Sequence, residues 1–142
     1  MINMLISLVV VIICAIILKL YTCKTNNSVR KHPKGDYVLK IIINKKINDD
    51  LSLILNLMKD SLFKVFPSLT NDPDLYAKWR KSGEAKIVLV GTSENMQKAY
   101  EQGKTKKILV TSKMHGNEMS LLVVGPGLKS EINEFTSDFR LF

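Results

Sequence analysis

Four polar residues in the first half of the sequence are spaced so that a helix would bring them to one face. Ser52, Asn56 and Lys59 follow at intervals of four and three residues, which match the helical repeat, and Asp60 comes directly after. Beyond residue 37 the only histidine is His115. Histidine is the side chain most often used as a general base, so this residue is a candidate for that role. A histidine beside a glycine in a loop can equally be solvated and without function, and that alternative stays open.

A group of lysines brackets a predicted strand over residues 106–111. Lysines so placed could contact phosphates, or they could simply form a solvated edge. The net charge of +8 fits either a mild preference for polyanions or ordinary solubility. Trp79 and Tyr76 lie on a predicted helix, where they could stack on bases or pack in the core. The lysines are Lys104, Lys106, Lys107 and Lys113.

Other kinds of site are missing from the sequence. It contains no glycine-rich phosphate loop and no nucleophile elbow. The two cysteines, Cys14 and Cys23, cannot form a disulfide framework. The two histidines, His32 and His115, are far apart in the sequence, so we expect neither a metal nor a cofactor.

Hydrophobic periodicity predicts an α/β fold in which helices pack on a mixed sheet of four to five strands. Pro67 is expected to stop the first helix. Gly125-Pro126-Gly127 is expected to stop the central strand that immediately precedes this segment. The candidate helix caps are Asp72, one of the three residues 48–50, and either Thr92 or Ser93. The expected strands are 37–44, 86–90, 106–111, 120–124 and 139–142, and the expected helices are 51–66, 72–82, 92–102 and 128–135, with a loop at 113–118.

The N-terminal region is almost entirely apolar. Residues 4–18 contain one polar side chain, Ser7, and the run extends over residues 2–21, which is about the ~20 residues needed to span a bilayer. A cleaved signal peptide or a core helix would be alternatives. Positive charge follows the run instead of preceding it, and the run shows no polar face, so a retained transmembrane helix is the favoured interpretation.

Three stretches of the sequence resemble one family. The run 75–90 has a helix tryptophan, a glycine four residues later and a lysine that opens the next strand. The run 122–127 ends in Gly-Pro-Gly, and the end of the chain, 129–142, combines a helix with a short aromatic-tipped strand. Together they resemble the type-2 peptidyl-tRNA hydrolases over residues 37–142. The apolar run predicts a transmembrane anchor (1–21), and the polar, basic stretch after it predicts a linker (22–36). The resemblance implies a peptidyl-tRNA hydrolase 2-like domain (37–142).

The resemblance also implies candidate site residues. The family carries Lys, then Ala-Ala-Gln, then His on its first helix, and those positions hold Ser52, Ile54-Leu55-Asn56 and Lys59 here. Its Asp-Ala-Gly-Arg-Thr run corresponds to the region 111–116, which is shorter. The implied catalytic set is Lys59, His115, Ser52 and Asn56, expected to lie near the Gly-Pro-Gly turn. The implied substrate-binding set is Lys104, Lys106, Lys107, Lys113, Gly125 and Gly127.

The replacements weaken the chemistry of the family, which cleaves the ester between a stalled peptide and its tRNA. Ester hydrolysis needs a base that activates water, and an exposed lysine, with a reference pKa of about 10.4, is a poor base at pH 7. Asp50 would repel a tRNA phosphate where the family has a cation. We therefore favour a catalytically impaired module that binds tRNA, peptidyl-tRNA, a ribosome or a protein. The alternative is an active hydrolase with a relocated active site.

The charge distribution predicts how the chain crosses the membrane. No Lys or Arg precedes the apolar run, and Lys19, Lys24, Arg30, Lys31 and Lys34 follow it. The positive-inside rule then keeps the C-terminal domain in the cytosol, on the mitochondrial outer membrane or the endoplasmic reticulum. Protease added to intact organelles should digest the domain, and carbonate should leave the chain in the membrane. Full protection from protease, or recovery in the carbonate extract, would refute this topology.

Overall fold

The computed structural model of the chain describes Ile13 and residues 31–142. The chain divides into two compact units between Arg30 and Lys31, and the second unit contains the α/β domain. The predicted transmembrane helix, residues 1–21, lies outside the described residues apart from Ile13. Among the described residues, no helix combines the length and the apolar character needed to cross a bilayer.

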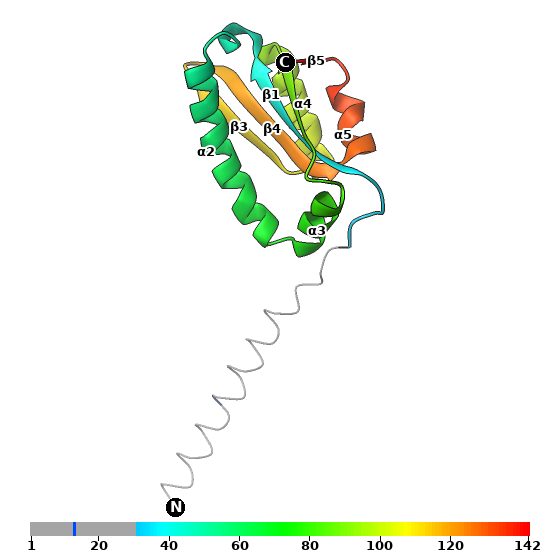
Figure 1. Cartoon of the computed structure of the whole chain (residues 1–142). Coiled ribbons are helices and arrows are strands. Elements are labelled where there is room, and N and C mark those ends of the chain that lie inside the picture. Colours follow the sequence, from blue (N-terminus) through cyan, green and yellow to red (C-terminus); the bar gives the residue numbers. More distant parts are fainter. Residues whose placement is uncertain (1–12, 14–30) are drawn as a thin grey trace, which may run out of the picture. The chain divides into compact units, whose positions relative to one another are not determined.

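A mixed five-stranded sheet forms the centre of the domain, in the order β3-β4-β1-β2-β5 (Figure 1). β1 is parallel to β2, and the other neighbouring pairs are antiparallel. This arrangement confirms the predicted α/β fold with a mixed sheet, and the predicted order of strands and helices is also confirmed. The strands are β1 (Tyr37–Asn44), β2 (Lys86–Gly91), β3 (Val110–His115), β4 (Glu118–Leu128) and β5 (Arg140–Leu141).

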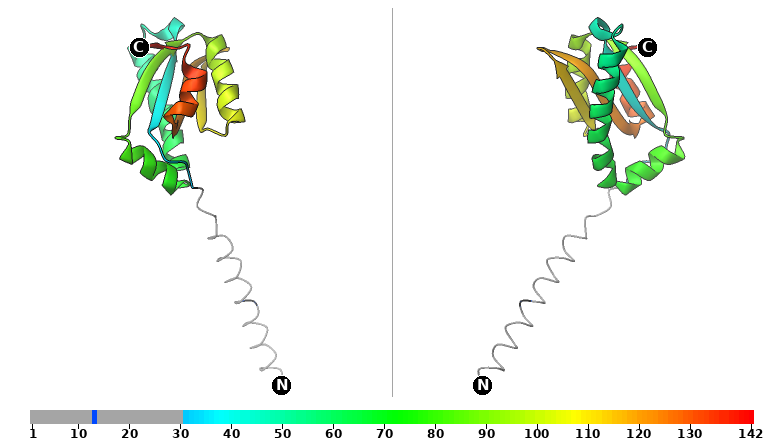
Figure 2. Two further views of the ribbon diagram at one scale, coloured as in Figure 1. Left: turned by 90° about the vertical axis from the view of Figure 1, so that its right-hand side faces the viewer. Right: turned by 60° about the vertical axis from the view of Figure 1, so that its left-hand side comes forward.

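Helices cover both faces of the sheet (Figure 2). On one face, α2 (Leu51–Thr70) and α3 (Pro73–Lys81) pack on Tyr37, Leu39, Ile41 and Ile43 of β1. On the other face, α4 (Ser93–Thr105) and α5 (Lys129–Thr136) pack on the alternate β1 residues. Successive strand residues point to opposite faces, so the near-continuous apolar run of β1 fills both cores. A short 3-10 helix, Lys45–Ile47, joins β1 to α2.

Short polar side chains begin three of the helices. The side chain of Asp50 accepts from the Leu53 N–H at 3.0 Å, that of Asp72 from Leu75 at 3.2 Å, and that of Thr92 from Asn95 at 3.3 Å. Each satisfies an amide that the first helical turn leaves free. The predicted cap Asp72 is confirmed, and the structure selects Asp50 from residues 48–50 and Thr92 instead of Ser93.

The expectation that Pro67 ends the first helix is wrong, because α2 continues to Thr70. A proline inside a helix removes one backbone hydrogen bond, at a cost of about 3 kcal/mol. Here Pro67 is exposed, so water can reach the carbonyl that loses its partner. Val65 and Leu69 are 1% and 2% exposed, and their burial holds the last turn on the core. Tertiary packing therefore overrides the local signal.

The expected limits of the two C-terminal hairpin strands are also wrong. β3 occupies 110–115 instead of 106–111, so the expected loop over 113–118 shrinks to Gly116 and Asn117 between the strands. β4 does not stop at Gly125. It continues to Leu128, with Gly127 opposite Val38 and Leu128 opposite Tyr37. A register shift between Val38 and Lys40 absorbs one extra residue of β4, so a bulge accommodates the Gly-Pro-Gly segment within the ladder.

Gly125 meets two conditions that a side chain would violate. Its φ is +97°, and a Cβ there would lie 2.6 Å from the Val38 carbonyl oxygen and 2.9 Å from the Gly127 nitrogen. Both neighbours are backbone atoms, which cannot turn aside as a flexible side chain can. Gly83, at the end of α3, has φ +79° but nothing within 4 Å of the same position. A side chain at Gly83 would therefore cause backbone strain alone, whereas one at Gly125 would cause the same strain and a steric collision as well.

Replacing these glycines by alanine should therefore destabilise the domain to different extents. Gly83→Ala carries only the left-handed strain and should lower the free energy of unfolding by about 1–2 kcal/mol. Gly125→Ala adds the collision and should cost more than about 3 kcal/mol. Urea denaturation of the two variants beside the wild type measures both. Equal losses would mean that the bulge in β4 relaxes freely.

Candidate functional site

The predicted polar residues of the first helix lie on the outer face of α2. Ser52, Asn56 and Lys59 are all exposed. The buried side of the helix is formed by Ile54, Ser61, Val65 and Leu69. Among the described residues, the side chains of Ser52, Asn56 and Lys59 make neither hydrogen bonds nor ion pairs. They therefore present free polar groups to solvent.

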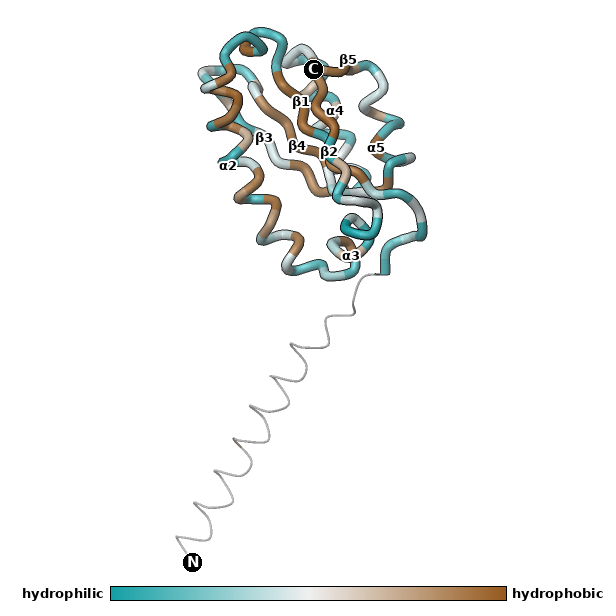
Figure 3. Tube along the Cα trace, viewed as in Figure 1, coloured by the Kyte–Doolittle hydropathy of each residue, from teal (hydrophilic) through white to brown (hydrophobic). Residues whose placement is uncertain are grey.

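Large apolar side chains share that outer face, which the sequence pattern did not predict. Leu51, Leu55, Phe63 and Phe66 are 62%, 64%, 69% and 48% exposed. The helical spacing of Leu51, Leu55 and Phe66 relative to Ile54 and Val65 would by itself predict an inward apolar face, and the structure instead exposes all three. Hydrophobic residues recur along the whole of α2 (Figure 3), so periodicity alone does not identify the inward side. The outer face of α2, here meaning Leu51, Leu55, Phe63 and Phe66 with Ser52, Asn56 and Lys59, is thus mixed in character.

His115 is the last residue of β3, at the hairpin, instead of lying in a longer loop. It is exposed and stands opposite Glu118 in the ladder. The Glu118 carboxylate is paired with Lys46, with 2.5 Å between Nζ and Oε1. Within residues 31–142, no side chain makes a hydrogen bond to the His115 imidazole. The ring consequently lacks the orienting partner that a general base normally has.

The four predicted phosphate-binding lysines do not form one cluster. Lys104, in the last turn of α4, and Lys106 and Lys107, just after it, lie together at the C-terminal end of this helix, and we call these three residues the lysine turn. The Lys104 ammonium is 5.1 Å from the centroid of the Tyr100 ring, and Lys106 is paired with Glu134. Lys113 lies instead on the side of β3 that faces α2, where its Nζ is 3.6 Å from an Asp60 oxygen.

The Gly-Pro-Gly segment is distant from the hairpin, contrary to the expectation that it lies near His115. The two lie towards opposite ends of β4, since the seven residue steps from Glu118, opposite His115, to Gly125 span roughly 23 Å. Gly125 and Gly127 are buried and lie near the start of β3: the Gly125 N–H donates to the Leu109 carbonyl at 2.8 Å. Their part in binding substrate stays a prediction. The candidate residues thus form two groups, one around the start of α2 and the hairpin, the other at the lysine turn.

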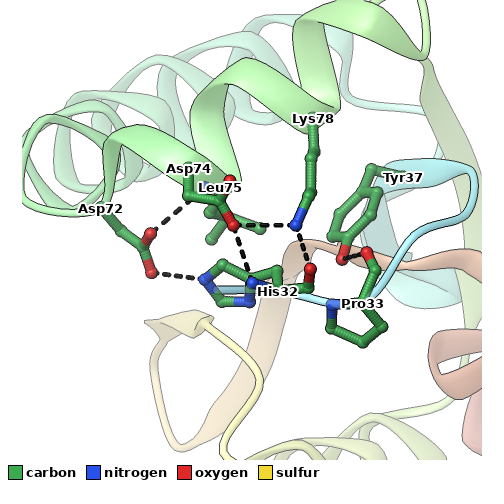
Figure 4. Close-up of polar contacts among 7 residues, drawn as sticks. All are labelled: His32, Pro33, Tyr37, Asp72, Asp74, Leu75 and Lys78. Atoms are coloured by element: carbon green, nitrogen blue, oxygen red, sulfur yellow. Dashed lines mark hydrogen bonds and ion pairs between the residues drawn. The ribbon is translucent and has the colours of Figure 1, made fainter. Parts of the chain in front are cut away.

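The sequence pattern also missed a polar clamp formed by the end of the predicted linker (Figure 4). The His32 backbone N–H donates to Asp74 Oδ2 at 2.7 Å, and its Nε2 lies 2.7 Å from Asp72 Oδ2. Lys78 donates to the His32 carbonyl and to Asp74. The Lys78 bond, then the His32 amide, lower the pKa of Asp74. Since the carboxylates lie about forty residues away, at the start of α3, no local sequence signal could reveal these contacts.

The clamp borders a pocket of about 470 Å³ that contains Lys34, Asp36, Lys78, Lys81 and Ser82 in its lining. Among the described residues, no three His, Cys, Asp or Glu side chains come together as a metal site would require. The Lys78 ammonium is already held by Asp74, with 2.8 Å between Nζ and Oδ2. The pocket therefore lies between residues 34–36 and the end of α3.

Comparison with known proteins places this chain in a family. The family described as "Peptidyl-tRNA hydrolase PTH2" matches residues 37–142. No curated protein matches. A solved structure of a protein of unknown function, Atu0240 from Agrobacterium tumefaciens strain C58, is similar with a TM-score of 0.51 and 10% identity, covering 77% of this chain and 99% of that one. That likeness concerns the fold alone. The match over residues 37–142 shows that the chain belongs to the peptidyl-tRNA hydrolase PTH2 family.

Proposed function

We propose that this protein is a membrane-tethered PTH2 domain that binds tRNA without hydrolysing peptidyl-tRNA. The observation that carries the proposal is the outer face of α2, where the family places its catalytic side chains. That face here combines exposed Leu and Phe side chains with Ser52, Asn56 and Lys59. None of these three polar residues is a base suited to neutral pH. The anchor, residues 2–21, is part of the proposal.

The chemistry of ester hydrolysis supports the loss of catalysis. The attacking water needs a base within hydrogen-bond reach whose pKa is near the working pH. Asn56 cannot be one, and Ser52 needs a base of its own. Exposure leaves Lys59 without the burial that activates a lysine. Asp50 is used as the cap of α2, since its carboxylate accepts from the Leu53 N–H, and its negative charge opposes the approach of a phosphate.

The lysine turn supports the binding half of the proposal. Lys104, Lys106 and Lys107 are exposed, and the chain reverses there, with Lys107 at φ +57°. Such a turn presents several ammonium groups to one stretch of a polyanion. Binding to a tRNA backbone would release counterions and would therefore weaken as salt rises. A ribosome, through its RNA, would be held by the same contacts.

A turnover assay tests the loss of catalysis. The purified full-length chain, incubated with peptidyl-tRNA, should release no tRNA above background. Lys59→His alone should not restore activity. Asp50 still occupies the position where the family has a cation, and the family's Asp-Ala-Gly-Arg-Thr run is missing. Robust turnover that disappears in His115→Ala would refute the proposal and establish a relocated active site. Turnover that is unchanged by substitutions at Ser52, Lys59 and His115 would refute the proposed loss of catalysis. It would also show that the site does not lie on α2.

A salt titration tests the binding. The double variant Lys104→Gln with Lys107→Gln should bind tRNA several-fold more weakly. The slope of log affinity against log salt should also fall by about one for each phosphate that the variant no longer neutralises. Lys45→Gln with Lys81→Gln, which removes two exposed lysines outside the lysine turn, is the matched control and should leave the slope unchanged. Equal effects of both substitutions, or wild-type binding without salt dependence, would show that the lysine turn is only a solvated surface.

A further inference from the structure

The outer face of α2 is unusual for a free surface. Eight large apolar side chains are exposed among the described residues, and Leu51, Leu55, Phe63 and Phe66 of α2 supply half of them. Isolated apolar residues on a surface need no explanation, whereas several on one helix face mark a surface that another body covers. α2 already packs its opposite side on the sheet. The outer face is therefore available for a second contact.

The charges beside these apolar residues restrict what that body can be. Lys59 and Lys64 are exposed on α2, and neither has an ion-pair partner among the described residues. The helix has one acidic residue, Asp60, and this is paired with Lys113. Helices that lie in the interface of an anionic bilayer typically combine Leu and Phe side chains with unpaired lysines, as α2 does here. A tRNA backbone would leave the apolar side chains in water.

The place where the tether joins the domain points to the same partner. His32 is fastened to Asp72 and Asp74, and these residues follow the last turn of α2 directly. Residues 22–31 can reach at most roughly 35 Å, about the length of α2 itself, roughly 30 Å. If residues 2–21 span a bilayer, the tether keeps α2 close to it. That confinement acts as a high local concentration, so even weak affinity for lipid suffices.

We propose that α2 lies on the surface of the anionic bilayer that anchors the chain. Leu55, Phe63 and Phe66 enter the boundary between headgroups and acyl chains, and Lys59 and Lys64 contact lipid phosphates. This inference rests on the anchor in the proposed function. Because α4 packs on the opposite face of the sheet (Figure 2), the domain would then present α4 to the cytosol, on the side away from the lipid.

Fluorescence quenching in proteoliposomes tests the proposal. The full-length chain, with Cys14→Ser and Cys23→Ser, receives a single thiol by Phe63→Cys and an environment-sensitive fluorophore on that thiol. Reconstitution uses phosphatidylcholine and phosphatidylserine, with nitroxide-labelled lipid as the quencher. We expect at least two-fold quenching at position 63. Gln97→Cys, at an exposed position on α4, should show none. Phe66→Cys provides a second probe on the same face.

Further arms separate the sources of a signal. Lys59→Gln with Lys64→Gln, or vesicles of phosphatidylcholine alone, should reduce the quenching at position 63. Equal quenching at positions 63 and 97, or none at either 63 or 66, overturns the proposal. Quenching that appears only at less than one chain per vesicle also overturns it, because at higher density a second copy then covers the face and keeps lipid away. Carbonate extraction is run in parallel: a chain that is extracted refutes the anchor and this inference together, whereas a retained chain without quenching refutes the inference alone.

Discussion

The pairing of β1 on both edges is the interaction on which the rest of the domain depends. β1 pairs with β4 on one side and with β2 on the other, and all eight of its residues are buried. A strand enclosed in this way must satisfy its polar side chains internally. Asn44 does so by donating to the Met119 carbonyl at 2.7 Å. Lys40 donates to Asn133 at 2.8 Å and to Thr136 at 2.7 Å, and burial, then the nearby Lys129, lower its pKa.

The sequence predicted the elements well where hydrophobic periodicity is unambiguous. The run of β1, the caps at Asp72 and Thr92 and the order of elements all follow from local signals. The same signals failed at Pro67 and Gly125, because burial of Leu69 and a bulge opposite Val38 outweigh the local preference for a break. They also failed for α2, which carries large apolar side chains on both its buried and its exposed side. Which side of α2 faces inward depends on how the helix packs against the sheet. The local hydrophobic pattern of the helix does not specify that packing.

The candidate site could be predicted only as a set of residue types. The family resemblance located the helix that carries it, and the helical repeat correctly placed Ser52, Asn56 and Lys59 on one face. The separation of Gly125 from His115 depends on β4 running unbroken between them, which the Gly-Pro-Gly signal concealed. The apolar part of the outer face also could not be recognised from sequence. A face built from both kinds of residue suits surface contact better than the activation of a water molecule.

The clamp around His32 determines where a pulling force on the N-terminal residues would act on the domain. Any pull on residues 1–30 reaches the domain first at His32, where bonds to Asp72, Asp74 and Lys78 of the α3 region share the load. Tyr37 adds a second tie, because its hydroxyl donates to the Pro33 carbonyl at 2.7 Å and its backbone N–H to Ser82 Oγ at 2.9 Å. Force is thus diverted into a helix before it can peel the first strand from the sheet. Under such a pull the central strand stays unloaded until these ties give way.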